Sequence, residues 1–228
     1  MNPLESRIAF HIGPVPVTEP VVTTWAIMVV MVVGAAYLAR RLTLVPPATQ
    51  ATLEGLVAAV DAQVREILRG EPAPYRGFVG TLFTFILLAN WSSIIPGVDP
   101  PTAHVETDAA LALLVFIAVI VYGIRVGGLR GYFRHFASPS VFMIPLNFVE
   151  TISRSFSMLV RLFGNVMSGV VLIGVVASLA RLFVPIPLMA LDLLTGAIQA
   201  YIFAILAAVF ISDAVSPETT KTTPKTEG

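Results

Sequence analysis

Cysteine is absent from the 228 residues, and charged residues are scarce, at 12%. Without cysteine, the chain has no disulfide, no thiol nucleophile and no cysteine-ligated metal. The three histidines, His11, His104 and His135, are too scattered in the sequence to predict a metal site, so each is interpreted as a loop or interface residue. An average soluble domain has about 25% charged residues. The low charge, together with 56% hydrophobic residues and a mean hydropathy of +0.85, predicts a polytopic membrane protein.

Further absences exclude whole classes of function. The formal net charge is zero, so there is no excess of basic residues to indicate nucleic-acid binding. The sequence has no P-loop, Gly-x-Ser-x-Gly or His-Glu-x-x-His motif, so nothing predicts nucleotide binding, hydrolysis, a metal or another cofactor. Residues 1–20 are punctuated by proline and contain Arg7 as their only base, which is a poor n-region for a signal peptide.

Apolar stretches divide the chain into elements, since about 20 apolar residues are needed to cross a bilayer. We predict an all-α polytopic membrane protein with five membrane-crossing helices and one interfacial amphipathic helix. The predicted organisation is an outer N-terminal segment 1–20, a single membrane domain 21–214 and a disordered cytoplasmic tail 215–228. Within the membrane domain the expected elements are a first span 21–39, the interfacial helix 48–69, a second span 78–95, a third span 109–124, a long helix 141–184 and a last helix 188–213.

Segment 48–69 is amphipathic, because apolar residues recur in it at steps of 3–4 while charged residues fill the other face. Its charge content forbids crossing, so we expect it to lie in the cytoplasmic interface. The alternative is a soluble connecting helix. Residues 96–108 are interpreted as a proline-rich acidic loop, and Pro72, Pro74, Pro185 and Pro187 as breaks between helices.

The basic residues predict the topology. Ten of the fourteen fall on one side of the predicted spans, and that side is cytoplasmic by the positive-inside rule. The N-terminus is then outside and the C-terminus inside. The ten are Arg40, Arg41, Arg65, Arg69, Arg76, Arg125, Arg130, Arg134, Lys221 and Lys225.

The long helix 141–184 exceeds the bilayer. At 1.5 Å per residue it would be roughly 65 Å long, against about 30 Å of hydrocarbon. It must tilt steeply, curve or break, and we expect the last two crossing helices to be strongly tilted.

Polar residues on the long helix form one helical stripe, at steps of 4, 3, 4, 4 and 3. They are Glu150, Arg154, Ser157, Arg161, Asn165 and Ser168. The last helix carries a shorter stripe of Asp192, Thr195 and Gln199. These groups could simply form hydrogen bonds with one another inside a helix bundle. For Ser157, Ser168 and Thr195, this structural interpretation and a functional one are equally suitable. The ionisable members are harder to explain in this way, because intramembrane ionisable residues usually mark ion or substrate pathways.

Arg161 is the most demanding member of the stripe. A central arginine costs about 2.5–3.5 kcal/mol on insertion scales, and it cannot lose its proton. Opposite a carboxylate at about 4 Å, its attraction would be roughly 4 kcal/mol at an effective dielectric near 20. A carboxylic acid that passed the arginine would therefore release its ion, and an ion could not leak past.

The motif Arg161-Leu162-Phe163-Gly164-Asn165, followed by Gly169, resembles that of the a subunit of F-type ATP synthases. Three further stretches are similar to the family: Asn90 to Gly97, Pro145 to Arg154, and Gln199-Ala200-Tyr201-Ile202-Phe203. The likeness covers about residues 75–214.

The resemblance implies a noncatalytic stator that couples proton translocation to ATP synthesis or hydrolysis. Arg161 would face a rotating ring of c subunits, with Gln199 and Asn165 nearby, Asp192 in an outer half-channel and Glu150 in a cytoplasmic one. Secondary polar lining is expected from Ser157, Ser168, Thr195, Asn90 and Arg154. Expected partners are the c-ring, b-type peripheral stalk subunits, the remainder of the complex and the lipid bilayer of a bacterial inner membrane, with no cofactor, metal or nucleic acid.

The sequence departs from the family pattern at Val170, where many relatives have Glu or His, at Asp192, often His or Glu, and at Ser155, where proline is common. Asp192 is thus the one titratable group expected in the outer half-channel. The departures leave sodium open as the coupling ion. Three rival functions are an unrelated ion-coupled transporter, which would need inverted repeats, an intramembrane enzyme, which would need a catalytic pair, and a structural scaffold.

Overall fold

The computed structural model describes residues 8–12, 15–40, 48–68, 73–95, 98–136, 143–179 and 185–215. Within these ranges it leaves out the side chains of residues 8–10, 12, 15–16, 48–49, 52–53, 56, 68, 129–136, 143–144 and 148. A short hairpin, β1 (Ile8–Ile12) and β2 (Val15–Thr18), precedes the helices. The helices are α1 (Glu19–Arg40), α2 (Ala48–Leu68), α3 (Ala73–Trp91), α4 (Val105–Phe136), α5 (Met143–Leu179) and α6 (Pro185–Val215). Two 3-10 turns, η1 (Ser92–Ile94) and η2 (Pro101–Ala103), connect α3 to α4.

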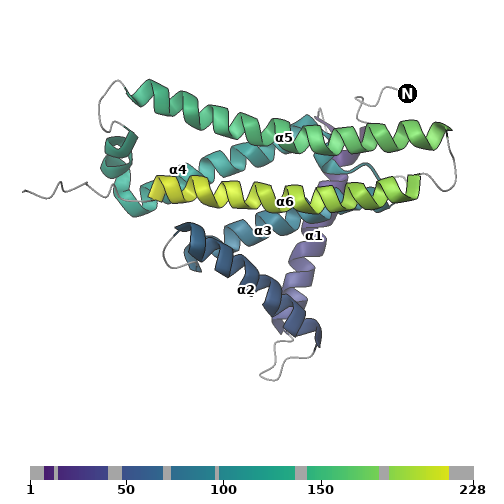
Figure 1. Cartoon of the computed structure of the whole chain (residues 1–228), viewed down its shortest axis with the longest axis horizontal. Helices are drawn as coiled ribbons and strands as arrows, with labels where there is room; N and C mark the ends of the chain where they lie inside the picture. The colour runs from purple at the N-terminus through teal and green to yellow at the C-terminus, as the bar shows by residue number, and fades with distance from the viewer. Residues whose placement is uncertain are drawn as a thin grey trace, which may run out of the picture.

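Helices α3, α4, α5 and α6 pack into one bundle, in which α5 and α6 run side by side along its length (Figure 1). Helices α3, α4 and α5 all pack against α6, and the buried face of α6 carries several alanines. Small residues allow helices to approach closely in a membrane, where packing rather than water exclusion drives association. The fully buried positions of α6 include Ala200, Ala207, Ala208 and Ile211.

Within the described residues, the five helices α1, α3, α4, α5 and α6 are long and apolar enough to cross a membrane. The predicted all-α polytopic architecture is therefore confirmed. Helix α1 has 22 residues, roughly 33 Å, whereas α5 has 37, roughly 55 Å. In Figure 1, α1 runs across the direction of α5 and α6. If α1 lies along the membrane normal, α5 and α6 are steeply tilted from it. Such a tilt would accommodate helices longer than the hydrocarbon layer, which is about 30 Å thick.

The hairpin was not anticipated within segment 1–20. Its strands are antiparallel, with Ile8 opposite Thr18 and Ile12 opposite Val15. The prolines of this segment argued against strands in the sequence. A two-stranded sheet nevertheless tolerates proline at positions whose N–H is not needed for a hydrogen bond between the strands.

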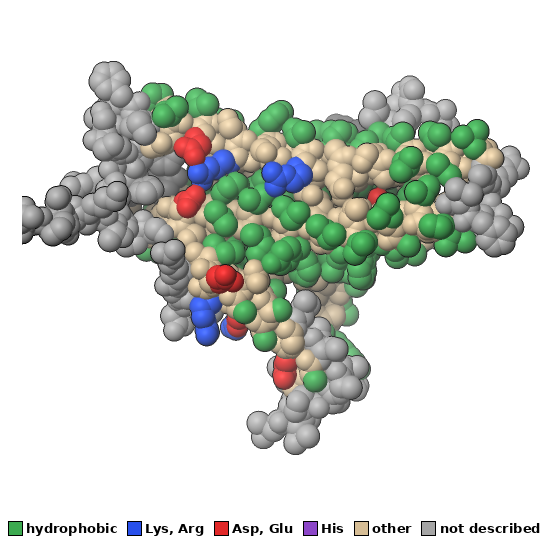
Figure 2. Space-filling view, in the orientation of Figure 1, with side chains coloured by type: hydrophobic (Ala, Val, Ile, Leu, Met, Phe, Trp, Pro, Cys, Tyr) green, Lys and Arg blue, Asp and Glu red, His purple; other side chains and the backbone are tan. Residues whose placement is uncertain are grey.

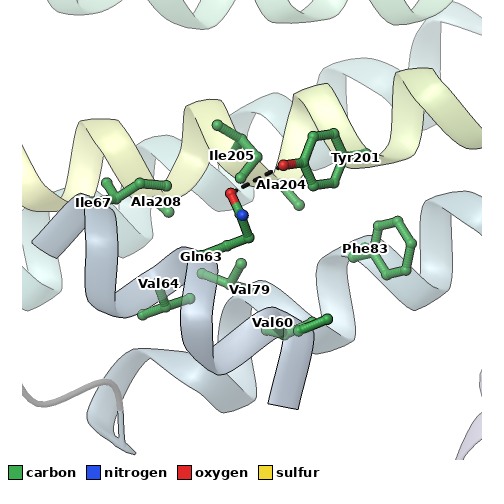
Figure 3. Close-up of a pocket in the computed structure, with 11 residues that line it drawn as sticks. Val60, Gln63, Val64, Ile67, Val79, Phe83, Tyr201, Ala204, Ile205 and Ala208 are labelled. Carbon is green, nitrogen blue, oxygen red and sulfur yellow. Dashed lines mark hydrogen bonds between the residues drawn. The ribbon is translucent and has the colours of Figure 1, made fainter. Parts of the chain in front are cut away.

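Helix α2 lies against α3 and α6, and three polar contacts attach it. Arg76 pairs with Asp61 at 2.8 Å, Tyr201 Oη donates to Gln63 Oε1 at 3.0 Å, and Ser212 Oγ donates to the Ile67 carbonyl at 3.1 Å. Figure 3 shows Gln63 of α2 pointing towards Tyr201 of α6; both residues line a small pocket whose other walls are apolar. The side chains of Glu54, Arg65 and Glu66 are exposed. Helix α2 is therefore an amphipathic helix that packs on the outside of the bundle.

Prolines interpreted as breaks instead begin helices. Pro74 is the second residue of α3, while Pro185 and Pro187 lie in the first turn of α6. The first turn of a helix tolerates proline because its N–H groups have no partner within the helix. The second and last spans therefore start earlier than the predicted residues 78 and 188.

The third span also differs from its prediction of 109–124. Helix α4 starts at Val105 and runs to Phe136, with a kink at Gly128, whose φ is +67°. Glu106 and Asp108, predicted to lie in a loop, belong to its first turn. Acidic residues are favourable there because they complement the positive end of the helix dipole.

Some predicted features fall on residues outside the described part of the chain. These are the ends of the long helix, 141–142 and 180–184, and the tail 216–228. The same holds for Arg41, Arg69, Lys221 and Lys225 of the topology prediction and for Arg7, together with the side chains of Arg130, Arg134 and His135.

Candidate functional site

Arg161 stands near the middle of α5 with its side chain exposed. It forms no hydrogen bond or ion pair with any residue that the structure describes. It borders an open hollow on the bundle surface, whose other lining residues are Ile152, Ser153, Phe156, Ser157 and Val160. The adjacent face of the same helix, with Met158 and Leu162, is buried. Helix α5 therefore buries Met158 and Leu162 in the bundle and directs a fixed cation outward, among exposed apolar side chains.

Figure 2 shows this surface of the molecule. Basic side chains stand on α5 where it runs beside α6, and hydrophobic side chains cover most of the surrounding area. The basic residues of α5 are Arg154 and Arg161. Arg154 is neutralised by two carboxylates, as described below, whereas Arg161 has no such partner among the described residues.

Towards one end of the pair, Asp192 of α6 lies directly against Gly169 of α5. A Cβ at Gly169 would overlap the Asp192 carboxylate, with Cγ only 2.8 Å away. A glycine is needed at this position because any larger residue would push the carboxylate aside. The contact places Asp192, a member of the polar stripe on α6, against the glycine that follows Ser168 of the α5 stripe.

Asp192 also lines a cavity of about 450 Å³ between α5, α6 and the connection that follows α3. Val170 lies in its wall and contributes an apolar side chain. Asp99 and Ser93 supply further polar groups. Asp99 thus lines the same cavity as Asp192, while the expectation that Asp192 is the one titratable group of an outer half-channel stays a prediction.

Towards the opposite end of the pair, Arg154 is held by two carboxylates. Its guanidinium donates to Glu150 at 2.5 Å, one turn away on α5, and to Asp213 of α6 at 2.7 Å. It also lies over the Phe210 ring, 5.3 Å from the centroid. Two carboxylates on one guanidinium leave this cluster with an excess negative charge.

These end contacts fix the antiparallel register of α5 and α6. The register places Gln199 about level with Asn165, which is one turn from Arg161. Both residues carry a buried amide nitrogen, Asn165 Nδ2 and Gln199 Nε2, without a hydrogen-bond partner among the described residues. No hydrogen bond joins Gln199 to Arg161 within that part of the chain. Unpartnered buried amides are commonly satisfied by ordered water.

The hydroxyl groups of the stripes behave in two ways. Ser168 Oγ donates to the Asn165 carbonyl at 2.8 Å, and Thr195 Oγ1 to the Asp192 carbonyl at 3.0 Å, each within its own helix. Ser157 is exposed beside Arg161 in the hollow. Ser168 and Thr195 thus satisfy themselves locally.

Asn90 connects three elements of the bundle. Its Nδ2 donates to the Gly196 carbonyl of α6 at 2.8 Å, and its Oδ1 accepts from Thr102 of η2 at 2.7 Å. Both ends of the buried amide are engaged, so Asn90 fixes α3 against α6 one turn from Asp192.

The arrangement places a free cation between two acidic clusters, with buried amides beside it. Carboxylates can accept and release protons, amides can hold water, and a guanidinium can favour the ionised form of a passing acid. Among the residues described, no three His, Asp or Glu side chains gather as a metal site would require.

Comparison with known proteins shows the family of the chain. The profile of the family described as "ATP synthase A chain" matches residues 21–212. The chain belongs to the ATP synthase A chain family. It is 51% identical to "ATP synthase subunit a 2" of Bradyrhizobium sp. strain BTAi1, over 94% of this chain and 96% of that protein. It is 45% identical to "ATP synthase subunit a 2" of Pelobacter propionicus, over 97% of each, and 42% identical to "ATP synthase subunit a" of Albidiferax ferrireducens, over 93% of each.

Membership of the ATP synthase A chain family confirms the resemblance based on Arg161 and its neighbours. The chain is a multi-pass subunit of the membrane sector, with a general role in ion translocation and no catalytic site of its own. Its partners are the remaining subunits of that complex.

Sequence reasoning missed three acidic residues of this family member. Asp99 and Asp108 were interpreted as parts of an acidic loop, although Asp108 is fully buried in α4. Asp213 was not singled out, yet it continues the polar face of α6, since 14 residues beyond Gln199 amounts to almost four full helical turns. Helical spacing could have found Asp213, whereas the place of Asp99 depends on packing.

Proposed function

We propose that this subunit supplies two offset half-channels and the arginine that separates them. Arg161 faces the membrane carboxylate of a rotating c-ring. Asp192 serves the outer half-channel and Glu150 the cytoplasmic one, while Gln199 and Asn165 hold water near Arg161. Ser157, Ser168, Thr195, Asn90 and Arg154 are secondary polar groups along these paths.

The guanidinium of Arg161, exposed and without an ion pair among the described residues, carries the proposal. A permanent charge at membrane depth is costly unless a counter-charge approaches it. Since no described residue of this chain provides one, an external carboxylate is the natural partner. The hollow beside Arg161 is lined mainly by apolar side chains, which suits a close-packed but moving helix surface.

The acidic clusters support two separate access paths. Asp192 of α6 contacts Gly169, which follows Arg161 by eight residues on α5. Arg154, at the centre of the other cluster, precedes Arg161 by seven residues. At 1.5 Å per residue, each cluster is roughly 10–12 Å from Arg161 along the helix. An ion would thus have to travel between the clusters on the ring rather than through this chain.

The proposed topology follows from the distribution of basic residues, and the proposed membrane, stalk partners and coupling ion follow from the family. The N-terminus is outside and the C-terminus cytoplasmic, in a bacterial inner membrane, and b-type stalk subunits hold the chain against rotation. The coupling ion is the proton. Sodium is the second candidate, because Val170 removes an ionisable group from the wall of the outer cavity.

The test is Arg161→Ala in the complete ATP synthase. ATP-driven proton uptake by membrane vesicles should be lost, and the passive proton leak should rise, because the barrier between the half-channels is gone. Arg125→Ala is the matched control, since this exposed arginine lies on α4 and belongs to neither polar stripe. Undiminished pumping in Arg161→Ala would overturn the proposal and favour an unrelated ion-coupled transport role instead.

A further inference from the structure

Asp108 is buried without a polar partner. Its exposed fraction is 0%, and neither carboxylate oxygen has a hydrogen-bond partner among the described residues. It shares a face of α4 with the buried Leu111, Ala112 and Val115. An unpaired anion is strongly disfavoured in such surroundings, so the carboxyl group requires a proton, a cation or water.

The charged residues of the packed helices do not supply that partner. Helices α5 and α6 pack against α4, and their described charged residues are Glu150, Arg154, Arg161, Asp192 and Asp213. On α4 itself, Glu106 and Arg125 are exposed. None of these seven forms a hydrogen bond or an ion pair with Asp108 in the described part of the chain.

Asp108 lies at the same end of the bundle as Asp192. Turn η2 packs against α3, α4 and α5. Its Thr102 donates to Asn90, which in turn donates to Gly196, one turn from Asp192 on α6. Buried polar groups therefore extend from η2, which directly precedes α4, to α6 one turn from Asp192. Asp192 shares its cavity with Asp99.

We propose that Asp108 is a further intramembrane proton-binding site of the outer half-channel. This inference rests on the proposed function. Buried water connects the carboxyl group with the cavity around Asp99 and Asp192, because two acceptor atoms without partners are the kind that ordered water satisfies. A proton arriving from water forms an O–H bond at one carboxylate oxygen, and that bond breaks when the proton returns to water. The exchange changes no other bond and needs no co-reactant.

The experiment compares Asp108→Asn, Asp108→Glu and Asp108→Thr in the complete complex in membrane vesicles. We expect Asp108→Asn to assemble and to slow ATP-driven proton uptake about tenfold, which is modest for a positioned proton-transfer group. The pH profile of uptake should change as well, because one titrating site is removed. Asp108→Glu should keep more of the native rate than Asp108→Asn, although the asparagine is the closer match in size.

Glu106→Gln is the matched control, because Glu106 is an exposed carboxylate in the same turn of α4. It should keep the native rate and pH profile. A native rate and profile in Asp108→Asn would overturn the inference. So would equal losses in the Asn, Glu and Thr variants, or the failure of all three to assemble, since each assigns Asp108 to packing alone.

Arg161→Ala, measured in the same vesicles, separates the two proposals. If it abolishes pumping while Asp108→Asn is native, this inference fails and the proposed function stands. If Arg161→Ala pumps normally, the proposed function fails and the role of Asp108 fails with it.

Discussion

The contact between Gly169 and Asp192 gives the sharpest prediction about how α5 and α6 fit together. In Gly169→Ala, the new Cβ would lie 2.8 Å from Asp192 Cγ and would overlap a carboxylate oxygen. Carbon atoms in ordinary contact are about 3.5–4.0 Å apart, so the two groups must separate by roughly 1 Å. Overpacking of this kind costs about 1–3 kcal/mol, while alanine recovers about 1 kcal/mol of helix propensity. We expect Gly169→Ala to be destabilised by about 0–2 kcal/mol overall, with the carboxylate displaced.

The assay combines thermal dissociation of the purified complex with proton uptake in vesicles. Gly169→Ala should lower both the dissociation temperature and the uptake rate. In Gly169→Ala/Asp192→Ala the overlap disappears, so stability should recover while transport stays low. Contacting residues typically show coupling energies of about 0.5–3 kcal/mol, and we expect a value in that range. Gly34→Ala on α1, where a Cβ meets open space, is the control and should be neutral or slightly stabilising.

Two results would refute this reasoning. One is native stability and native transport in Gly169→Ala, which would mean that the helices are not in close contact at this position. The other is additive behaviour in the double variant, which would mean that the methyl group and the carboxylate do not compete for the same space.

Two further predictions concern the hydrogen bonds that hold α6. Asn90→Leu should lower the dissociation temperature by an amount equivalent to roughly 1–3 kcal/mol, because the Gly196 carbonyl and the Thr102 hydroxyl lose their partner; an unchanged temperature would show that the bundle end does not depend on this amide. Tyr201→Phe should cost about 0.5–1.5 kcal/mol by removing the hydrogen bond to Gln63. Adding Gln63→Leu should then cost little more, and a double variant that loses the full sum would contradict the coupling of α2 to α6.

Hydropathy and helical spacing alone predicted much of the fold. Five apolar stretches, one amphipathic helix and an overlong helix with Arg161 near its centre could all be recognised, because the length of a bilayer-crossing helix and the 3.6-residue period act on each segment separately. Helix starts were less predictable. Pro74 and Pro185 look like breaks in a sequence, since the tolerance of a first turn for proline depends on where that turn begins.

The tertiary structure decided which polar groups meet. Spacing placed Glu150, Arg154 and Arg161 on one stripe, but it did not indicate that Asp213 would pair with Arg154, whereas no described residue pairs with Arg161. It also did not place Asp99 in the cavity of Asp192, or bury Asp108. Such contacts join residues far apart in the chain, so they depend on the register between packed helices. The sequence by itself determined that a fixed cation sits within a membrane helix, and only the packing of α5 on α6 determined that the cation faces outward between two acidic clusters.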